Sequence, residues 1–398
     1  MRSLQTSIVK TVYLDYASTT PVDPQVVASM LPFFSQKFGN PSSFHHKGME
    51  AKNAVDDARS RIASLLGCSP HELFFTSGGT ESINFALKGI AFAHKQKGNH
   101  IITSTLEHHA VLDTCAYLEK QGFTVTYVPV DAQGRVNPKD VERAITPKTI
   151  LISIMYANNE IGTIEPISEI GTLAQKQGIY FHSDACQAAG ALDLDVRKLH
   201  VDLLTINGSK IYGPKGIGLL YARKGIALEP LLHGGGQERG MRSGTENVPY
   251  IVGFAKAFEL AQSHRDQENK RLTKLRDALI SGLLKIDKTR LNGPKSNRLP
   301  NNVNISFLDI EGEAMLLYLN EKGICASTGS ACASQSLETS HVLRAIGMPY
   351  EASHGSLRFS LGKYTTFADI KKVLAVMPSI VKTLRELSPV RLTIKHFQ

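Results

Sequence analysis

Short apolar runs rich in β-branched residues alternate with amphipathic stretches through the middle of the chain. The runs recur roughly every 25 to 30 residues, which is typical of an α/β fold with a doubly wound, mostly parallel sheet. The expected strands are Leu73–Thr76, Ile101–Ser104, Thr124–Pro129, Ile150–Met155, Ile179–His182 and Leu203–Ile206. The expected helices between them include Val111–Lys120, Pro138–Ala144 and Ser168–Gln177.

The pattern changes from about Asp266, where a charged helix leads into short strands and a long final helix. This order of elements predicts a second, smaller α+β domain that the N-terminal segment joins. We therefore expect a large domain over 15–262 and a small domain made of 1–14 and 263–398. A length of 398 residues agrees with about two domains. The expected elements of the small domain are helix Lys270–Leu284, strands Asn302–Leu308 and Ser356–Leu361, and a helix over Ile370–Leu387.

The composition is ordinary for a globular protein, with 42% hydrophobic and 20% charged residues. No run of about 18 apolar residues occurs, so no membrane span is expected. The first ten residues lack the apolar core of a secretion signal, which predicts a cytoplasmic protein. The net charge of +9 contains no long basic block and indicates a solvated surface, with weak attraction of an acidic partner or RNA as the alternative.

The five cysteines are scattered along the chain and never follow a CxxC spacing. An odd number without such a spacing argues against a disulfide framework and against a zinc site. It fits a reduced compartment, where a reactive thiol persists. The cysteines are Cys68, Cys115, Cys186, Cys325 and Cys332.

Ligands of doubly wound sheets bind beyond the carboxyl ends of the strands, so the residues that follow each strand are the candidates for a site. Ser77-Gly78-Gly79-Thr80 follows the first expected strand and precedes a helical run from Ile83. A glycine turn before a helix start is suited to holding a phosphate with backbone N–H groups. A purely structural glycine turn is the alternative reading of this motif.

The later strand ends carry polar groups of different kinds. Each has a plain structural alternative, because an exposed loop histidine, a helix N-cap aspartate and a surface lysine are all common. Taken together, a phosphate cradle, a ring-facing histidine, an amide, a carboxylate and an amine are what pyridoxal 5'-phosphate (PLP) requires. The residues are Glu107-His108-His109, Asn158-Asn159, Asp184 and Lys210.

The sequence resembles the group I (NifS/IscS-type) cysteine desulfurases, which belong to the class V aminotransferase family with PLP-dependent transferase fold type I. The similarity runs nearly end to end, and its blocks occur in the family's order. The blocks are Tyr13–Ala17 with Thr19-Thr20-Pro21, Gly39–Ser43, Thr76–Ser82, Glu107-His108, Asn158–Gly162, Asp184 with Gln187, Lys210–Gly218, His233–Thr245, Ser330-Ala331-Cys332 and Arg358-Phe359-Ser360.

The resemblance implies a role for each matching residue. Lys210 is implied to be the Schiff-base lysine, His108 to stack on the PLP ring and shuttle protons, and Asp184 to pair with the ring nitrogen. Asn159 and Gln187 address the ring oxygen side. Phosphate binding is implied for Gly79, Thr80, Asn207, Ser209 and, from the other subunit of a homodimer, Thr245. Arg358, Asn40 and Asn159 are implied to bind the substrate, because the planar arginine fork suits its carboxylate.

Cys332 lies in a run of small residues, 327–334, which predicts a mobile loop over about 326–337. The resemblance implies that its thiol collects sulfur from L-cysteine as a persulfide and passes it to an acceptor, such as an iron–sulfur scaffold or a tRNA- or cofactor-thiolating protein. No resident metal is implied, although Cys332 could ligate an iron–sulfur cluster transiently with a scaffold. A buried structural role fits Cys325 better, because it follows the apolar Ile324.

Two features depart from the family pattern. The family has Ser-x-His before the Schiff-base lysine, whereas this chain has Asn207-Gly208-Ser209. The C-terminal segment from Ser388 also lacks the longer tail with which IscS-type members dock their scaffold. The alternatives to a cysteine desulfurase are a selenocysteine lyase, a cysteine sulfinate desulfinase, another class V aminotransferase, or a basic RNA- or scaffold-binding protein that keeps only the fold.

Overall fold

The computed structural model describes residues 11–328 and 339–397, apart from the side chain of residue 396. The chain divides into two compact units. The large unit contains 19–159 and 163–267, and the small unit contains the N-terminal residues through Ser18, Glu160–Gly162 and the chain from Glu268 onward. The sequence placed its boundaries after residues 14 and 262, and it did not separate the three-residue segment.

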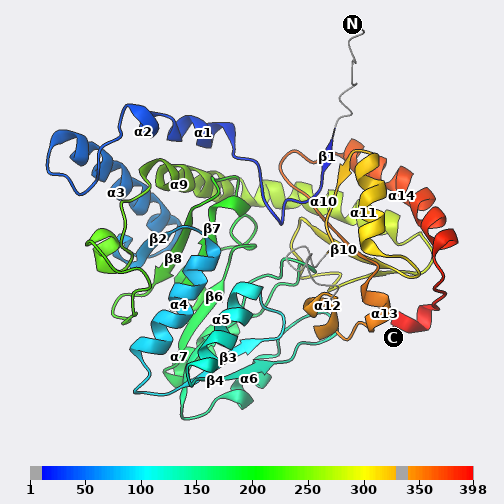
Figure 1. Cartoon of the computed structure of the whole chain (residues 1–398), viewed down its shortest axis with the longest axis horizontal. Helices are drawn as coiled ribbons and strands as arrows, with labels where there is room; N and C mark the ends of the chain where they lie inside the picture. Colours follow the sequence, from blue (N-terminus) through cyan, green and yellow to red (C-terminus); the bar gives the residue numbers. More distant parts are fainter. Residues whose placement is uncertain (1–10, 329–338, 398) are drawn as a thin grey trace, which may run out of the picture. The chain divides into compact units, whose positions relative to one another are not determined.

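The large unit is built on a seven-stranded sheet with the order β2-β8-β7-β6-β5-β3-β4 (Figure 1). Six strands run in one direction, and β8 is antiparallel to both of its neighbours. The expected mostly parallel α/β sheet is therefore confirmed. The strands are β2 (Leu73–Thr76), β3 (His100–Ser104), β4 (Thr124–Val128), β5 (Thr149–Ser153), β6 (Tyr180–Asp184), β7 (Leu203–Asn207) and β8 (Gly218–Ala222).

The helices of the large unit follow from their apolar spacing and their end signals. In α7 the buried residues Ile167, Ile170, Gly171 and Ala174 share one face, and the helix ends at Gly178, which has a left-handed φ of 66°. The helices are α1 (Pro24–Met30), α2 (Pro32–Ser35), α3 (His46–Leu66), α4 (Gly79–Ala93), α5 (His109–Lys120), α6 (Pro138–Ala144), α7 (Ile167–Gln177), α8 (Val196–Leu199) and α9 (Val248–Ser263).

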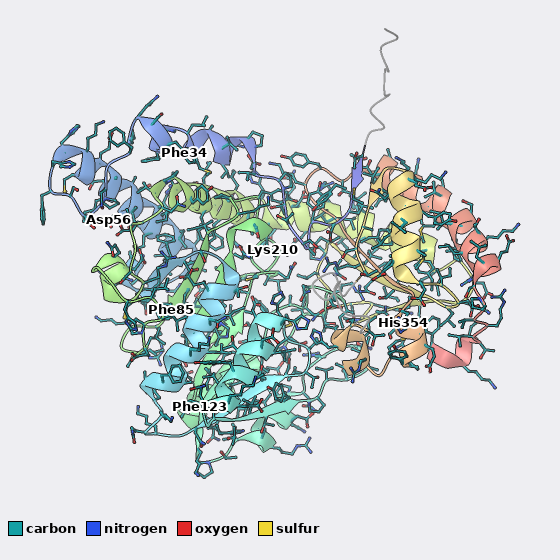
Figure 2. All side chains as sticks on the ribbon, viewed as in Figure 1. Phe34, Asp56, Phe85, Phe123, Lys210 and His354 are labelled. Atoms are coloured by element: carbon teal, nitrogen blue, oxygen red, sulfur yellow. The ribbon has the colours of Figure 1, made fainter. Side chains whose placement is uncertain are left out.

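Aromatic side chains fill the space between α4 and the sheet. Phe85, labelled in Figure 2, is fully buried and meets Phe74 edge to face at 6.0 Å between ring centroids. Leu151 of β5 and Leu203 of β7 belong to the same buried cluster. This packing holds the sheet and α4 in one fixed arrangement, which matters because α4 begins at a strand end.

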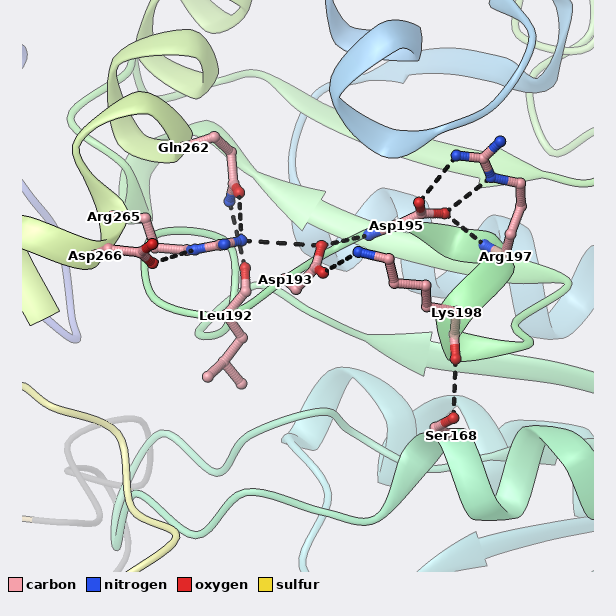
Figure 3. A network of polar contacts seen from close by, with 9 residues as sticks. All are labelled: Ser168, Leu192, Asp193, Asp195, Arg197, Lys198, Gln262, Arg265 and Asp266. Carbon is pink, nitrogen blue, oxygen red and sulfur yellow. Dashed lines mark hydrogen bonds and ion pairs between the residues drawn. The ribbon is translucent and has the colours of Figure 1, made fainter.

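A polar network lies at the surface of the large unit (Figure 3). Asp193 pairs with Lys198 at 2.7 Å, and Ser168 of α7 donates to the Lys198 carbonyl at 2.8 Å. Gln262 of α9 donates to the backbone carbonyls of Ala189 and Leu192. The network therefore joins the segment after β6 to two helices without using any strand-end residue.

The small unit has its own sheets and its own core. A three-stranded antiparallel sheet has the order β12-β10-β9, and β1 pairs in parallel with β11. Phe307, Phe359, Leu357 and Ile305 are completely buried between the sheet and the helices. The strands are β1 (Val12–Tyr13), β9 (Thr289–Leu291), β10 (Asn302–Phe307), β11 (Ile324–Cys325) and β12 (Ser356–Ser360). The helices are α10 (Arg265–Leu283, which starts in the large unit), α11 (Gly312–Glu321), α12 (His341–Ala345), α13 (Tyr350–Ser353) and α14 (Phe367–Leu387).

Among the residues that the structure describes, no helix is both long and apolar enough to cross a membrane. Within the same residues, no group of three or more His, Cys, Asp or Glu side chains is placed to hold a metal ion.

Candidate cofactor site

Five parallel strands of the large unit bring their carboxyl ends to one edge of the sheet. These strands are β2, β3, β5, β6 and β7, and each is followed by polar or glycine residues that the sequence singled out. Direct contacts join three of these ends, because a Cβ on Gly79 would meet both Cys186 and Asn207. The carboxyl edge of the sheet is therefore one assembled site.

The N-terminus of α4 forms one end of the site. The helix starts at Gly79, four residues before the helical run that the sequence predicted from Ile83, and its N-cap is Gly78. Because the N-cap carries no side chain, none is present there to accept from the first N–H groups of the helix. These donors and the helix dipole suit a phosphate group. An added Cβ at Gly78 would meet no atom within 4 Å, whereas one at Gly79 would lie 2.8 Å from Cys186 Sγ.

His108 stands at the end of the β3 segment as the N-cap of α5. Its Nδ1 accepts from the Ala110 N–H at 3.0 Å, so the neutral ring carries its proton on Nε2. Burial lowers the pKa of His108, the positive charge of Lys210 lowers it further, and the Asp184 carboxylate acts in the opposite direction. A neutral ring with Nε2–H available is suited to stacking on an aromatic ligand and to moving a proton.

Asp184 is the last residue of β6 and is buried. Its Oδ1 accepts from the backbone N–H of Cys186 at 2.9 Å, which orients the carboxylate. Asp184 also acts electrostatically on both His108 and Cys186. A buried carboxylate at a strand end, close to a lysine, suits pairing with a protonated heterocyclic nitrogen.

Lys210, labelled in Figure 2, lies in a 3-10 turn directly after β7 and is half-buried. Asn207 Oδ1 accepts from both the N–H and the hydroxyl of Ser209 at 3.3 Å, which stabilises the start of the turn. Thr20 closes the other side, since its N–H and hydroxyl donate to the Ser209 carbonyl and its oxygen accepts from the Tyr212 N–H. The turn is thus held from two directions, and its lysine is placed near His108.

The other predicted residues of the large unit occupy different surroundings. Asn159 and Gln187 are half-buried after β5 and β6, whereas Thr80, Asn40 and Thr245 are exposed. Asn40 Oδ1 accepts from the Ser42 N–H at 2.9 Å. Gly244 donates to Gln237, which fixes the turn before Thr245.

Arg358 is a buried residue of β12 in the small unit. One guanidinium nitrogen donates to Asp15 Oδ1 at 2.9 Å and to Ser18 Oγ at 2.8 Å. Glu160 of the same unit is also buried, accepts from Ser340, and is influenced by the charge of Arg358. Cys332 lies outside the described residues. Cys325 is half-buried in β11.

Glu107 was named in the sequence without a role, and the structure shows it as a buried acidic residue of the site. It precedes His108, and its Oε1 accepts from Ser104 Oγ at 2.7 Å and from the Met155 N–H at 2.9 Å. Burial raises the pKa of Glu107 to about 8. The Glu-His pair was visible in the sequence, but a glutamate before a loop histidine gives no signal that it is buried.

PLP fits the groups that the structure assembles at this edge. A helix N-terminus without an N-cap side chain suits its phosphate, and the buried Asp184 carboxylate suits its ring nitrogen. The neutral imidazole of His108 suits its ring face, and the amine of Lys210 suits its aldehyde carbon. All four groups lie in the large unit.

Comparison with known proteins identifies the family. Residues 12–373 match the family described as Aminotransferase class-V. The chain is 58% identical over 389 residues to "Cysteine desulfurase IscS" of Methanosarcina thermophila, which covers 98% of this chain and 96% of that protein. It is 55% identical over 383 residues to a protein of the same name from Clostridium botulinum, covering 96% of each.

Solved structures agree with this assignment. A "NIFS-LIKE PROTEIN" superimposes with a TM-score of 0.89 and 41% identity, covering 94% of this chain and all of the other. "SspA in complex with cysteine" superimposes with a TM-score of 0.80 and 40% identity, covering 89% of this chain. The sheet order, the strand-end groups and these similarities agree, and the chain belongs to the PLP-dependent class-V aminotransferase family.

Proposed function

We propose that this chain is a PLP-dependent cysteine desulfurase that converts L-cysteine to L-alanine and passes the sulfur to an acceptor. The observation that carries the proposal is the meeting of Lys210, His108 and Asp184 at one sheet edge. It is supported by 58% identity, over 98% of the chain, to a protein named cysteine desulfurase. PLP supplies the electron sink for bond breaking at the substrate Cα.

The proton chemistry is assigned to three side chains. Lys210 holds the cofactor, and its amine takes the proton from the substrate Cα once the substrate has replaced it. Asp184 keeps a proton on the ring nitrogen, because a buried carboxylate stabilises the adjacent positive charge. His108 stacks on the ring and moves a proton through Nε2, since its Nδ1 is occupied by Ala110.

The remaining cofactor contacts are binding roles. Asn159 and Gln187 address the ring oxygen side, and the α4 N-terminus binds the phosphate. Asn207 and Ser209 complete the phosphate shell in place of the Ser-x-His of the family. We further propose a homodimer in which the second copy supplies Thr245, which is exposed on this chain. The phosphate contacts from the α4 start are Gly79 and Thr80.

Substrate binding is assigned to Arg358, with Asn40 and Asn159. The Arg358 guanidinium is held by Asp15 and Ser18 through one nitrogen. These bonds hold the planar guanidinium in a defined orientation, and a planar arginine fork suits a carboxylate.

Sulfur transfer is assigned to Cys332 as a thiolate. Its sulfur attacks the sulfur of the substrate, so that an S–S bond forms while the substrate C–S bond breaks. The bonding electrons of the C–S bond remain with the carbon that becomes the methyl group of alanine. The outer sulfur of the resulting Cys332 persulfide is passed to an acceptor of the cytoplasm, such as an iron–sulfur scaffold or a thiolation protein.

The test is the stoichiometry of the reaction. The PLP-loaded protein is incubated with L-cysteine and a reducing thiol, and alanine and sulfide are measured together. Equal amounts of both are expected, with none from Lys210→Ala. L-selenocysteine, cysteine sulfinate and an amino acid–keto acid pair are assayed beside it. Faster turnover of any of these would favour the corresponding lyase, desulfinase or aminotransferase, and light scattering of the loaded protein tests the dimer.

A further inference from the structure

Cys186 occupies a position between two groups that the proposed cofactor site uses. It follows Asp184 by two residues, is buried, and belongs to none of the roles assigned above. It differs from Cys115, the other buried cysteine among the described residues, which lies in the apolar cluster of α5. The neighbours of Cys186 include the Asp184 carboxylate and the backbone of Gly79.

The first contact is with Asp184. The backbone N–H of Cys186 donates to Asp184 Oδ1 at 2.9 Å. Burial and the nearby Asp184 carboxylate raise the pKa of the Cys186 thiol, so the two side chains lie close to each other. The N–H donor orients one carboxylate oxygen, and the neighbouring Cys186 side chain limits the space in which the carboxylate can rotate. Cys186 therefore acts on the group assigned to the cofactor ring nitrogen.

The second contact is with the start of α4. An ideal Cβ built on Gly79 would lie 2.8 Å from Cys186 Sγ, closer than real Cβ contacts allow. It would lie 3.5 Å from Cβ and Nδ2 of Asn207, which is ordinary van der Waals separation. Residue 79 must therefore be glycine because the sulfur of Cys186 occupies the place of a Cβ, whereas Asn207 would leave room for one.

We propose that Cys186 is a positioning residue that sets the spacing between the phosphate-binding start of α4 and the Asp184 carboxylate. Cys186 lies against Gly79 through its sulfur and donates to Asp184 through its backbone N–H, so a change at either contact moves one end of the cofactor site relative to the other. The inference rests on the proposed PLP site, and it concerns cofactor affinity before any substrate is present.

The test is a double-mutant cycle on PLP affinity, measured by titrating the cofactor-free protein with PLP and following fluorescence and absorbance. Gly79→Ala should weaken PLP binding by about tenfold or more, because overpacking displaces either the thiol or the helix start. Cys186→Ala alone should weaken PLP binding by about threefold, because the space between Gly79 and Asp184 loses the sulfur that fills it. The double variant should bind at least about threefold more tightly than Gly79→Ala, since the obstacle to the new methyl group is gone.

Two further variants separate positioning from general packing. Cys115→Ala removes another buried thiol from the same unit and should leave PLP affinity unchanged, even if it lowers the melting temperature. Cys186→Ser keeps a polar side-chain atom in place of the sulfur, so it should bind PLP more tightly than Cys186→Ala. Circular dichroism of each cofactor-free variant checks that it is folded.

The inference would be overturned if the two substitutions acted independently on PLP affinity. The double variant would then bind PLP more weakly than Gly79→Ala, by the same factor that Cys186→Ala shows alone. Equal losses from Cys115→Ala and Cys186→Ala would overturn it as well. A wild-type protein that bound no PLP would instead defeat the proposed function. If wild type bound PLP tightly but the two substitutions affected PLP affinity independently, only this inference would fail and the proposed function would stand.

Discussion

The carboxyl group of Glu107 accepts a hydrogen bond from the backbone N–H of Met155, with 2.9 Å between Oε1 and N. The bond joins the segment after β3 to the segment after β5. Asn158 strengthens the same link by donating to the Leu106 carbonyl at 3.0 Å. The loops that carry His108 and Asn159 are therefore fastened to each other behind the site.

Glu107 should make stability depend on pH in a specific direction. Its pKa is raised to about 8 by burial, above about 4.3 in an unfolded chain. The contribution of Glu107 to the free energy of unfolding is therefore fully present below the unfolded pKa and is lost as pH rises through about 8. Glu107→Gln should reduce this loss. Between pH 5 and pH 8 the free energy of unfolding of the variant should fall by about 1 kcal/mol or more less than that of wild type.

Urea denaturation of the cofactor-free protein at both pH values measures the difference. Glu142 of α6 is exposed, and Glu142→Gln should show no such pH-dependent gain. A Glu107→Gln variant that lost stability between pH 5 and pH 8 as steeply as wild type would place the pH dependence elsewhere, with Glu165, also raised to about 8, as the next group to test.

The buried pair of Arg59 and Glu238 should be important for stability. Their side chains are 9% and 3% exposed, Arg59 also donates to the Leu73 carbonyl, and Glu238 accepts from the Phe75 N–H at 3.0 Å. Glu238→Ala should cost about 3 kcal/mol, because it leaves a buried guanidinium without its anion. Chemical denaturation measures the cost. Asp56→Ala, which breaks an exposed pair with Lys52, should cost less than about 1 kcal/mol; similar costs would contradict the argument.

The Arg358–Asp15 pair should affect substrate affinity more than turnover. Arg358→Lys loses the planar fork and should raise KM for L-cysteine by about tenfold or more. Asp15→Asn keeps an acceptor for the guanidinium and should raise KM by about threefold, with kcat nearly unchanged. Arg344 of the same unit is exposed, and Arg344→Lys should change neither constant. A drop in kcat at constant KM for Arg358→Lys would move the carboxylate site elsewhere.

Strand positions were largely predictable because the central strands are buried on both faces. β5 is buried along its whole length, and its run of apolar residues was visible in the sequence. The strand β2 was predicted with the bounds that the structure has. In contrast, β8 was missed, since it follows a turn rich in glycine and its antiparallel pairing with β7 and β2 depends on distant residues.

The site was predictable to the extent that strand ends share an edge. That rule placed His108, Asp184 and Lys210 together without any contact being known. It could not reveal Cys186 against Gly79 or Asp15 against Arg358, because these contacts join residues more than a hundred positions apart. Side-chain contacts of this kind follow from the packing of whole elements, which a local pattern does not contain.

Asp184→Asn should leave the fold intact and slow alanine formation by about a thousandfold. The amide is nearly isosteric and still accepts from the Cys186 N–H, but it no longer stabilises a proton on the cofactor ring nitrogen. Single-turnover formation of alanine measures the effect, and the melting temperature checks the fold. Near-normal alanine production would remove Asp184 from the assigned role.

Cys332→Ser should separate proton chemistry from sulfur transfer. Lys210, His108 and Asp184 are unchanged in this variant, so it should bind PLP, change its absorbance when L-cysteine is added, and exchange the substrate Cα proton with solvent. A serine hydroxyl is far less acidic than a thiol and does not replace it as a sulfur nucleophile. The variant should therefore form neither alanine nor sulfide from L-cysteine.

Cys325→Ser is the matched control for Cys332→Ser, because Cys325 is a half-buried residue of β11, paired with Tyr13 of β1. Cys325 lies within a strand, and the loss of its thiol should leave desulfurase activity close to wild type. Activity retained in Cys332→Ser but lost in Cys325→Ser would show that the small-residue run had indicated the wrong thiol. Loss of PLP binding in Cys332→Ser would point instead to a structural role for Cys332, since none of the proposed cofactor contacts includes that residue.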